Sequence, residues 1–325
     1  MGDIHPLTGP AGMFAARLKK NLVRLAPWLK RTGVSCYRAY DRDIPELPMA
    51  VDVYGDEHGG IWLVVVGWSP KHGGGAAFQA LVERCAEAAA DIFAIPGDHA
   101  VVQIREPGRG GELEAAELEQ SVHSLVVREG PARLRLHLGA RRDPGLFLDH
   151  RSTRALVCDV VKGRRLLNLF AYTGSFSVQA GLAGAASTLS VDLSASTCRW
   201  AEENLALNGL QAPRHRVLVA DALAFLDDHA DVWDVIVIDP PSFSKSRRSA
   251  RTFDVQRDHG ALIAAALVRL APGGEIIFSC NRRDFRLERD RLSSSVLVED
   301  LTAATSPPDF RGVPHHCFRI RERSR

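Results

Sequence analysis

Apolar and polar positions divide the chain into two stretches of different character. Before about residue 145, short strand-like segments surround a single helical segment. After it, apolar runs of strand length alternate with helical segments. The first pattern is typical of a small α+β domain, and the second of an open α/β sheet. We therefore expect a helical extension at residues 1–35, a small α+β domain at 36–145 and an α/β domain at 146–325.

The first stretch should begin with an amphipathic helix. Phe14, Leu18 and Leu22 lie on one stripe of it, and the helix should end near Pro27 and Gly33. A second helix is expected at residues 76–94. Strands are expected at 36–40, 49–54, 61–66, 100–105 and 132–138. No catalytic spacing stands out here, so we expect a substrate-docking or scaffold domain.

In the second stretch, strands and helices should alternate. Strands are expected at 166–170, 188–192, 215–220, 233–239 and 275–280, and helices at 153–161, 194–207 and 259–270. The last helix should end at Pro272-Gly-Gly, and residues 316–320 should add an edge strand. Because ligands of such sheets bind outside the carboxyl ends of the strands, the residues that follow each strand are the candidates for chemistry.

The first of these strands leads into a tight turn. Residues 166–174 read LLNLFAYTG, and Ser175 is a plausible N-cap for the helix that follows. The turn lacks the Gly-x-Gly-x-x-Gly fingerprint, and no Walker Lys-Ser/Thr occurs, so no pyrophosphate cradle is indicated. A nucleoside cofactor without phosphates fits better, and S-adenosylmethionine is the common one.

Two acids follow the next two strands. Asp192 lies 18 residues beyond Gly174, a spacing at which a carboxylate can accept both hydroxyls of a ribose. The alternative is a helix N-cap, but Ser194 can serve that purpose. Asp221 could accept from the exocyclic amine of adenine. It could equally be an N-cap, and its value lies in occurring in series with Asp192.

The most informative short motif is Asp239-Pro240-Pro241-Ser242-Phe243. Consecutive prolines restrict φ and remove two amide donors, which keeps the chain extended after the fourth strand. Phe243 then offers an aromatic face on which a nucleic-acid base can stack. Asp239 could contact either substrate or cofactor.

Composition narrows the setting. The six cysteines contain no Cys-x-x-Cys pair, which argues against zinc and against a disulfide framework and fits a reducing cytosol. No secretory signal and no apolar run of about 18 residues is present, so we expect a cytoplasmic protein with neither metal nor membrane segment. The net charge is only +2, yet basic residues cluster at 17–31, 245–258 and 311–325. Such clusters are usually solvated faces, but three of them could form a phosphate track.

These motifs together resemble the class I S-adenosylmethionine-dependent methyltransferases that act on RNA. The match is most specific for the guanine-N7 methyltransferase module of bacterial 23S rRNA, usually the C-terminal half of a bifunctional enzyme, and it covers about residues 13–320. Beyond the motifs already quoted, it is carried by CYRAYDRDIPE at 36–46, GLFLDHR at 145–151, WAEENLALNG at 200–209, FDVQRDH at 253–259 and Asp309-Phe-Arg.

The resemblance implies a Rossmann-like methyltransferase sheet, the cofactor S-adenosylmethionine and an rRNA partner, either 23S rRNA or the pre-ribosomal large subunit. It also implies roles for individual residues. Cofactor contacts would come from Phe147, Asp149, His150, Arg151, Asn168, Phe170, Ala171, Tyr172, Thr173, Gly174, Asp192, Leu193, Asp221, Ala222 and Asp239. The target base would face Asp239, Pro240, Pro241 and Phe243. RNA phosphates would contact Lys245, Arg247, Arg248, Arg251, Arg282 and Arg283.

Guanine N7 carries a free lone pair, so its methylation needs alignment and water exclusion but no general base. One departure leaves a second reaction open. The family has Asn where this chain has Cys280, and related cytosine-C5 methyltransferases have a nucleophilic cysteine there. We favour a small buried thiol at Cys280 over a nucleophile, because the remaining motifs match the guanine family. A non-catalytic RNA-binding assembly factor is the third hypothesis, and the intact acids at Asp192, Asp221 and Asp239 argue against it.

Overall fold

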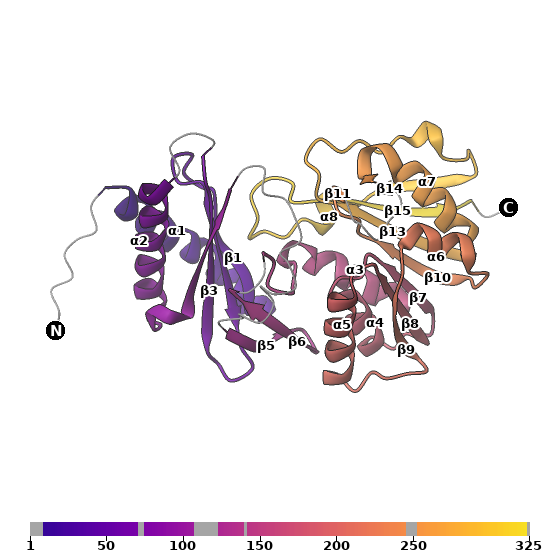
Figure 1. Cartoon of the computed structure of the whole chain (residues 1–325), viewed down its shortest axis with the longest axis horizontal. Helices are drawn as coiled ribbons and strands as arrows, with labels where there is room; N and C mark the ends of the chain where they lie inside the picture. The colour runs from indigo at the N-terminus through magenta and orange to yellow at the C-terminus, as the bar shows by residue number, and fades with distance from the viewer. Residues whose placement is uncertain (1–8, 71–74, 107–122, 140–141, 245–251, 324–325) are drawn as a thin grey trace. The chain divides into compact units, whose positions relative to one another are not determined.

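The computed structural model describes residues 9–70, 75–106, 123–139, 142–244 and 252–323. The chain forms two compact units, coloured from indigo to yellow along the sequence in Figure 1. The first comprises Met1–Gly130, Arg135–Leu148 and Pro308–Arg311. The second comprises Pro131–Leu134, Asp149–Pro307 and Gly312–Arg325.

The first unit is built on a four-stranded sheet with two helices on one face (Figure 1). Its strand order is β1-β2-β3-β4, with β3 and β4 parallel and the other neighbours antiparallel. The helices bury Phe14, Leu18 and Val82 against the strands. The strands are β1 (Cys36–Asp41), β2 (Met49–Gly55), β3 (Ile61–Trp68) and β4 (Ala100–Arg105), and the helices are α1 (Gly9–Thr32), α2 (Gly75–Phe93) and the 3-10 turn η1 (Gly97–His99).

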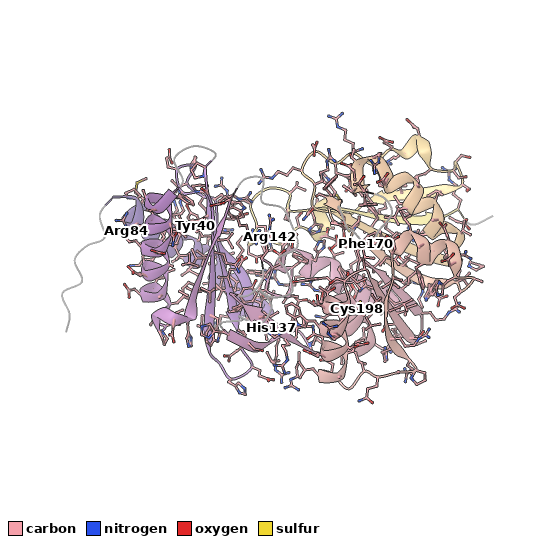
Figure 2. All side chains as sticks on the ribbon, in the orientation of Figure 1. Tyr40, Arg84, His137, Arg142, Phe170 and Cys198 are labelled. Atoms are coloured by element: carbon pink, nitrogen blue, oxygen red, sulfur yellow. The ribbon has the colours of Figure 1, made fainter. Side chains whose placement is uncertain are left out.

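The expected end of helix α1 near Gly33 is confirmed, whereas Pro27 lies inside the helix and does not end it. The helix ends before Gly33, which has a φ of 66° and donates its N–H to the Leu29 carbonyl at 2.8 Å. The helix is held by its apolar stripe, since the Phe14 ring packs 4.9 Å from that of Tyr40, which Figure 2 labels. Burial of this stripe outweighs the one hydrogen bond that proline removes.

Two further segments contribute to the first unit. β5 (His123–Glu129), which the sequence pattern did not predict, pairs with β6 (Ala132–Leu138) in a two-stranded sheet. Residues 131–134, at the start of β6, belong to the second unit. The Asp309-Phe-Arg motif belongs to the first unit although it lies near the end of the chain. Asp309 accepts the backbone N–H of Arg38 at 2.9 Å, and the Arg38 guanidinium lies 4.4 Å from the centre of the Phe310 ring.

The second unit is a doubly wound α/β domain with a seven-stranded sheet of order β14-β15-β13-β10-β7-β8-β9. The five strands from β13 to β9 are parallel, and β15 runs antiparallel to both its neighbours. The strands are β7 (Arg165–Leu169), β8 (Ser187–Asp192), β9 (His215–Val219), β10 (Trp233–Ile238), β13 (Leu270–Cys280), β14 (Val296–Asp300) and β15 (His316–Glu322). The helices are α3 (Arg151–Val161), α4 (Ser175–Leu182), α5 (Ala195–Leu207), α6 (Ala222–Asp228), α7 (Val255–Val268) and α8 (Thr302–Thr305), with 3-10 turns η3 (Leu148–His150) and η4 (Arg289–Arg291).

Successive side chains of each central strand point to opposite faces of this sheet, and both faces are covered by helices. Ile236 and Ile238 of β10 pack with α6 and α7, whereas Val235 and Val237 pack with α3 and α4. A strand buried on both sides reads as a continuous apolar run, as residues 235–238 do.

Two expectations about the end of the chain are wrong. Residues 316–320 do not form an edge strand, because β15 lies between β13 and the unpredicted edge strand β14. Pro272-Gly-Gly does not terminate α7, which ends at Val268, but lies within β13. The register between β10 and β13 shifts between Trp233 and Val235, and this irregularity accommodates the proline and glycines.

The strand order creates a switch point at β7. β8 and β9 follow on one side of it, whereas β10 and β13 lie on the other. Ile238 of β10 is paired with Leu169 of β7 and Phe278 of β13, so these strands end level with one another. The ligand crevice of a doubly wound sheet lies at such a point. None of the helices in the described part of the chain is long and apolar enough to cross a membrane.

Candidate active site

The turn after β7 has a strained backbone. Phe170, labelled in Figure 2, and Tyr172 have φ values of 56° and 50°, and Gly174 has 74°. Side-chain-bearing residues rarely adopt this region, and strain of this kind clusters at functional sites. The Gly174 N–H closes the turn on the Ala171 carbonyl at 2.9 Å. The N-cap of α4 is Gly174, not Ser175 as expected, because Ser175 is the first helical residue.

Two predicted cofactor residues in this region lie inside the domain. The Asn168 amide donates to Ser177 Oγ at 3.1 Å, and only 1% of the Asn168 surface is exposed. Thr173 is equally buried, and its carbonyl accepts from the Asn204 amide of α5 at 3.0 Å. These contacts fix the shape of the turn from its buried side. The part of it left open consists of Phe170, Tyr172 and the backbone between them.

Asp192 at the end of β8 ties three segments together. Its Oδ2 accepts from the Tyr172 N–H at 2.9 Å, and its Oδ1 accepts from the Ser194 N–H at 2.9 Å and Thr197 Oγ1 at 3.0 Å. Ser194 is the N-cap of α5, as the sequence suggested, so Asp192 does not cap that helix. These bonds fix the Asp192 carboxylate beside the turn. Leu193, half-buried, follows it.

Asp221 is the N-cap of α6. Its Oδ1 accepts from the N–H groups of Leu223 and Ala224 at 3.0 and 3.2 Å. The capping role that the sequence left open is therefore real. Capping engages one carboxylate oxygen, so the other is left for a ligand amine. Ala222, the first residue of α6, is buried beneath this position.

The segment after β10 is braced from several sides. Asp239 Oδ1 accepts from Ser279 Oγ at 2.7 Å, and Ser242 Oγ donates to Asn281 Oδ1 at 2.7 Å. β11 (Phe243–Ser244) pairs with β12 (Phe253–Asp254) directly before α7. Pro240 is buried and Pro241 is exposed, so the two prolines form a step from the core to the surface. Phe243 at its end is 59% exposed, which is unusual for a large apolar side chain and suits base stacking.

A buried histidine pair adjoins Asp239. His150 Nε2 lies 3.3 Å from Asp239 Oδ2, and its ring stacks on that of His315 at a centroid distance of 4.3 Å. His315 Nδ1 in turn lies 3.4 Å from Asp149 Oδ2. Burial lowers the pKa of His150 from its ordinary value of 6.5, against the opposing pull of the Asp239 and Asp149 carboxylates. Arg151 follows as the first residue of α3.

The same cluster is the candidate metal centre among the described residues. Asp149, His150 and His315 each offer one ligand atom, all within 4.8 Å of one another. A metal ion binds an imidazole nitrogen in the plane of the ring, at about 2.1 Å. The two rings are only 24° from parallel and stacked, so their nitrogen lone pairs do not converge on one point. The arrangement fits hydrogen bonding better than metal ligation.

Phe147, the remaining residue of the predicted GLFLDHR site, belongs to the first unit and is 37% exposed. Asp149, His150 and Arg151 belong to the second. The unit boundary thus falls inside this motif, after Leu148.

Cys280 faces the core. It is fully buried among the residues that pack under α6 and α7, including Phe278 and Phe285. Its Sγ accepts the Arg282 N–H at 3.4 Å. Burial raises the pKa of the thiol to about 12, so it is protonated near neutral pH. A nucleophilic cysteine needs the thiolate and access to the substrate, and Cys280 has neither.

The predicted phosphate contacts divide into two groups. Arg282 is already engaged, because its guanidinium pairs with Asp254 at 3.0 Å and with Asp284 at 2.9 Å. Arg283 is exposed on the same segment. The remaining candidates, Lys245, Arg247, Arg248 and Arg251, lie outside the described residues.

Sequence reasoning missed two residues that contact the site. Ser279 directly precedes Cys280, and His315 directly precedes the strand expected at 316–320, but neither was a candidate site residue. Pairing the register of β10 with that of β13 would have placed Ser279 beside Asp239, since Ile238 aligns with Phe278. No local pattern marks His315, which reaches the site through the return of the chain into β15.

Comparisons with known proteins identify the family. Residues 41–315 match the model of a family described as S-adenosylmethionine-dependent methyltransferase. The chain is 42% identical over 321 residues to the ribosomal RNA large subunit methyltransferase K/L of Chromohalobacter salexigens and 43% identical over 309 residues to that of Pseudoalteromonas atlantica. These alignments cover 98% and 94% of this chain but only 43% of each relative.

Solved structures share the fold. The structure of the methyltransferase SMU.776, complexed with SAH, covers 97% of this chain with a TM-score of 0.75 at 20% identity, and 83% of that protein is matched. A SAM-dependent methyltransferase from Streptococcus mutans gives a TM-score of 0.74, also at 20% identity, over 97% of this chain and 82% of its own. The Rossmann-like methyltransferase architecture expected from the sequence is confirmed.

Proposed function

Because the chain belongs to the S-adenosylmethionine-dependent methyltransferase family, we propose that it methylates N7 of a guanine in large-subunit ribosomal RNA. Its cofactor is S-adenosylmethionine. The rRNA substrate is inferred from relatives named as large-subunit rRNA methyltransferases, of whose length this chain spans less than half. The observation that carries the proposal is the braced Asp239-Pro-Pro-Ser-Phe243 segment, which presents an acceptor and an exposed aromatic ring at the switch point.

In this proposal the cofactor lies along the strand ends from β7 to β9. The strained turn of Phe170 to Gly174 surrounds its methionine portion, and Asp192 accepts from the ribose hydroxyls. The free oxygen of Asp221 accepts from the adenine amine. The positions support this order, because the three strands end side by side in register. When bound, the cofactor supplies a methyl group activated by its sulfonium.

The side chains of the site position the target base for methyl transfer. Phe243 stacks on a base taken out of the RNA helix, as enzymes that modify bases in structured RNA require. Asp239 accepts from one edge of that base, which directs N7 toward the cofactor. Since N7 carries a lone pair and no proton, the site contributes alignment and water exclusion. The buried Pro240 and the packed Phe170 and Phe253 rings, 5.7 Å apart, support a dry floor.

RNA phosphates are proposed to contact Arg283 and the basic residues between Ser244 and Thr252, in the cytoplasm where rRNA is assembled. Arg282 is assigned a different part. Its pair with Asp254, the N-cap of α7, anchors the end of β13 to that helix, and Asp254 also pairs with Phe243 between β12 and β11, so Arg282 supports the segment that carries Phe243.

A cytosine-C5 reaction is disfavoured by the placement of Cys280. Cytosine C5 is weakly nucleophilic, and its methylation requires a thiolate that adds to C6. The Cys280 thiol points into the core beneath α6 and α7, and its pKa is raised to about 12 by burial.

The test is methyl transfer in vitro. The purified protein is incubated with isotopically labelled S-adenosylmethionine and unmodified large-subunit rRNA, and the digested nucleosides are identified by mass spectrometry. We expect labelled 7-methylguanosine. Label in 5-methylcytidine, or none with protein that binds the cofactor, would contradict the proposal.

The cofactor assignment is tested separately by calorimetry. Asp192→Asn should weaken S-adenosylmethionine binding by ~10-fold or more, because a hydrogen bond to a charged group contributes about 1.5–3 kcal/mol. Asp228→Asn, an exposed acid at the end of α6, is the matched control and should bind normally. Equal affinity for the two variants would remove Asp192 from the cofactor site.

A further inference from the structure

The buried histidine beside Asp239 has no role in the helix that it precedes. His150 is the N-cap of α3 but makes no side-chain capping bond. Only 3% of its surface is exposed, and its ring packs between His315 and the edge of Phe176. An imidazole is an expensive group to bury, since its polar atoms lose their water. Its Nε2 lies 3.3 Å from Asp239 Oδ2 and 3.9 Å from Asp149 Oδ2, so Asp239 is the nearer of the two carboxylates.

The environment selects the charge and the tautomer of His150. Burial favours the neutral ring, as the lowered pKa indicates. In the neutral ring one nitrogen carries the proton, and the other has only a lone pair. Nδ1 is buried without a hydrogen-bond partner, so a proton there would be an unpaired donor. A proton on Nε2 instead faces a carboxylate oxygen. The Nε2–H tautomer therefore fits this site.

Asp239 consequently has one donor on each oxygen. Ser279 Oγ donates to Oδ1 at 2.7 Å, and in the Nε2–H tautomer the His150 proton faces Oδ2, with Nε2 and Oδ2 3.3 Å apart. The two donors come from α3's N-terminus and from β13, which are both fixed by packing. They set the rotation of the carboxylate and leave one lone pair on each oxygen. The Asp239 side chain is 19% exposed, so these lone pairs are open to a ligand.

A fixed pair of acceptors matches one base edge. The Watson–Crick edge of guanine presents two adjacent donors, N1–H and the N2 amino group, whereas that of cytosine presents one donor, the N4 amino group, followed by acceptors at N3 and O2. Resting on the function proposed above, we propose that His150 is a positioning residue which, with Ser279, orients Asp239 to accept from N1–H and N2–H of the target guanine. N7 lies on the opposite side of the base, so these two hydrogen bonds direct N7 away from Asp239 and toward the methyl donor.

The test uses inosine, which keeps N7 and N1–H but lacks the N2 amino group. Two rRNA fragments are compared, with guanosine or inosine at the mapped target position. The wild-type protein should prefer guanosine by ~10–100-fold in kcat/KM, the discrimination expected for one hydrogen bond to a charged group. His150→Phe keeps a ring for stacking on His315 but removes the donor. It should lower kcat/KM for guanosine and reduce the guanosine preference to less than ~3-fold.

A matched variant separates hydrogen bonding from packing. His150→Gln can place an amide N–H near the position of Nε2 and should restore most of the guanosine preference. The guanosine-to-inosine ratio is measured at saturating S-adenosylmethionine, so that a change in cofactor affinity does not enter the comparison. If His150→Phe fails to fold, Ser279→Ala removes the other donor and should reduce the same ratio.

The outcomes distinguish this inference from the proposed function. If wild-type protein methylates guanosine and inosine equally, or if His150→Phe and Ser279→Ala lower both rates with the ratio intact, His150 does not orient Asp239 and the inference is wrong. If wild-type protein methylates neither fragment at N7, the proposed function itself is wrong.

Discussion

Gly174 provides a sharp test of the turn on which the site depends. Its φ is 74°, and a Cβ added there would lie 3.0 Å from the Cβ of Ala201 on α5. Gly174→Ala should therefore cost about 1–2 kcal/mol for the left-handed backbone and on the order of 1 kcal/mol for the contact. For a domain of this size, about 2–3 kcal/mol lowers the melting temperature by roughly 4–12 °C.

The two contributions can be separated. Gly209, just after α5, has a φ of 70° but no neighbour within 4 Å of an added Cβ. Gly209→Ala should show the backbone cost alone, about 1–2 kcal/mol, and should bind S-adenosylmethionine normally. Ala201→Gly removes the contact but itself costs about 1 kcal/mol of helix propensity, so the contact energy is obtained from a double-mutant cycle of Gly174→Ala and Ala201→Gly. Denaturant unfolding and cofactor calorimetry on these variants and Gly209→Ala provide the measurements.

Gly174→Ala alone should also weaken cofactor binding, because relief of the contact shifts the turn that Asp192 holds through the Tyr172 N–H. The reasoning is refuted if Gly174→Ala unfolds like Gly209→Ala and binds the cofactor with wild-type affinity. The turn would then be neither tightly packed against α5 nor part of the binding site.

Three further predictions concern single side chains. Cys280→Ala should keep the rate of methyl transfer within ~3-fold of wild type and lower the free energy of unfolding by on the order of 1 kcal/mol. Complete loss of transfer in a folded variant would instead support methylation of cytosine C5. Phe243→Ala should lower kcat/KM for RNA by ~10-fold or more, the size of one base stack, with calorimetric cofactor affinity unchanged; weaker cofactor binding would place Phe243 elsewhere in the site. Because the pKa of folded His150 lies below 6.5, the unfolded chain binds the extra proton, so stability should fall as pH drops below about 6.5. His150→Gln should lose that part of the slope in pH-dependent melting, and an identical slope would show that His150 is not the group responsible.

The central strands and the site edge could be predicted because their signals are local. An apolar run such as residues 235–238 is buried on both faces of a sheet. The acid or turn that follows such a run must therefore lie at the carboxyl end of the sheet, where ligands bind. The candidates Asp192, Asp221 and Asp239 all follow strands as expected. Their roles toward ligands remain predictions.

What could not be predicted depends on contacts distant in sequence. β14 has three apolar residues followed by two acids and no fully buried position, so its sequence does not mark a strand until β15 is seen to pair with it. His315 and His150 are far apart in the chain, and only the return into β15 stacks their rings. Asp221 shows a different limit, because one residue both caps a helix and retains an acceptor, and a sequence pattern cannot separate the two uses.

The proposed methylation of guanine N7 in large-subunit rRNA can be tested by nucleoside-resolved mass spectrometry of rRNA from cells with and without this protein. We expect one guanosine position that carries an N7 methyl group only when the protein is present, and that loses it in cells expressing Asp192→Asn. An unchanged guanosine methylation pattern, or a protein-dependent methyl group on cytosine C5, would contradict the proposal.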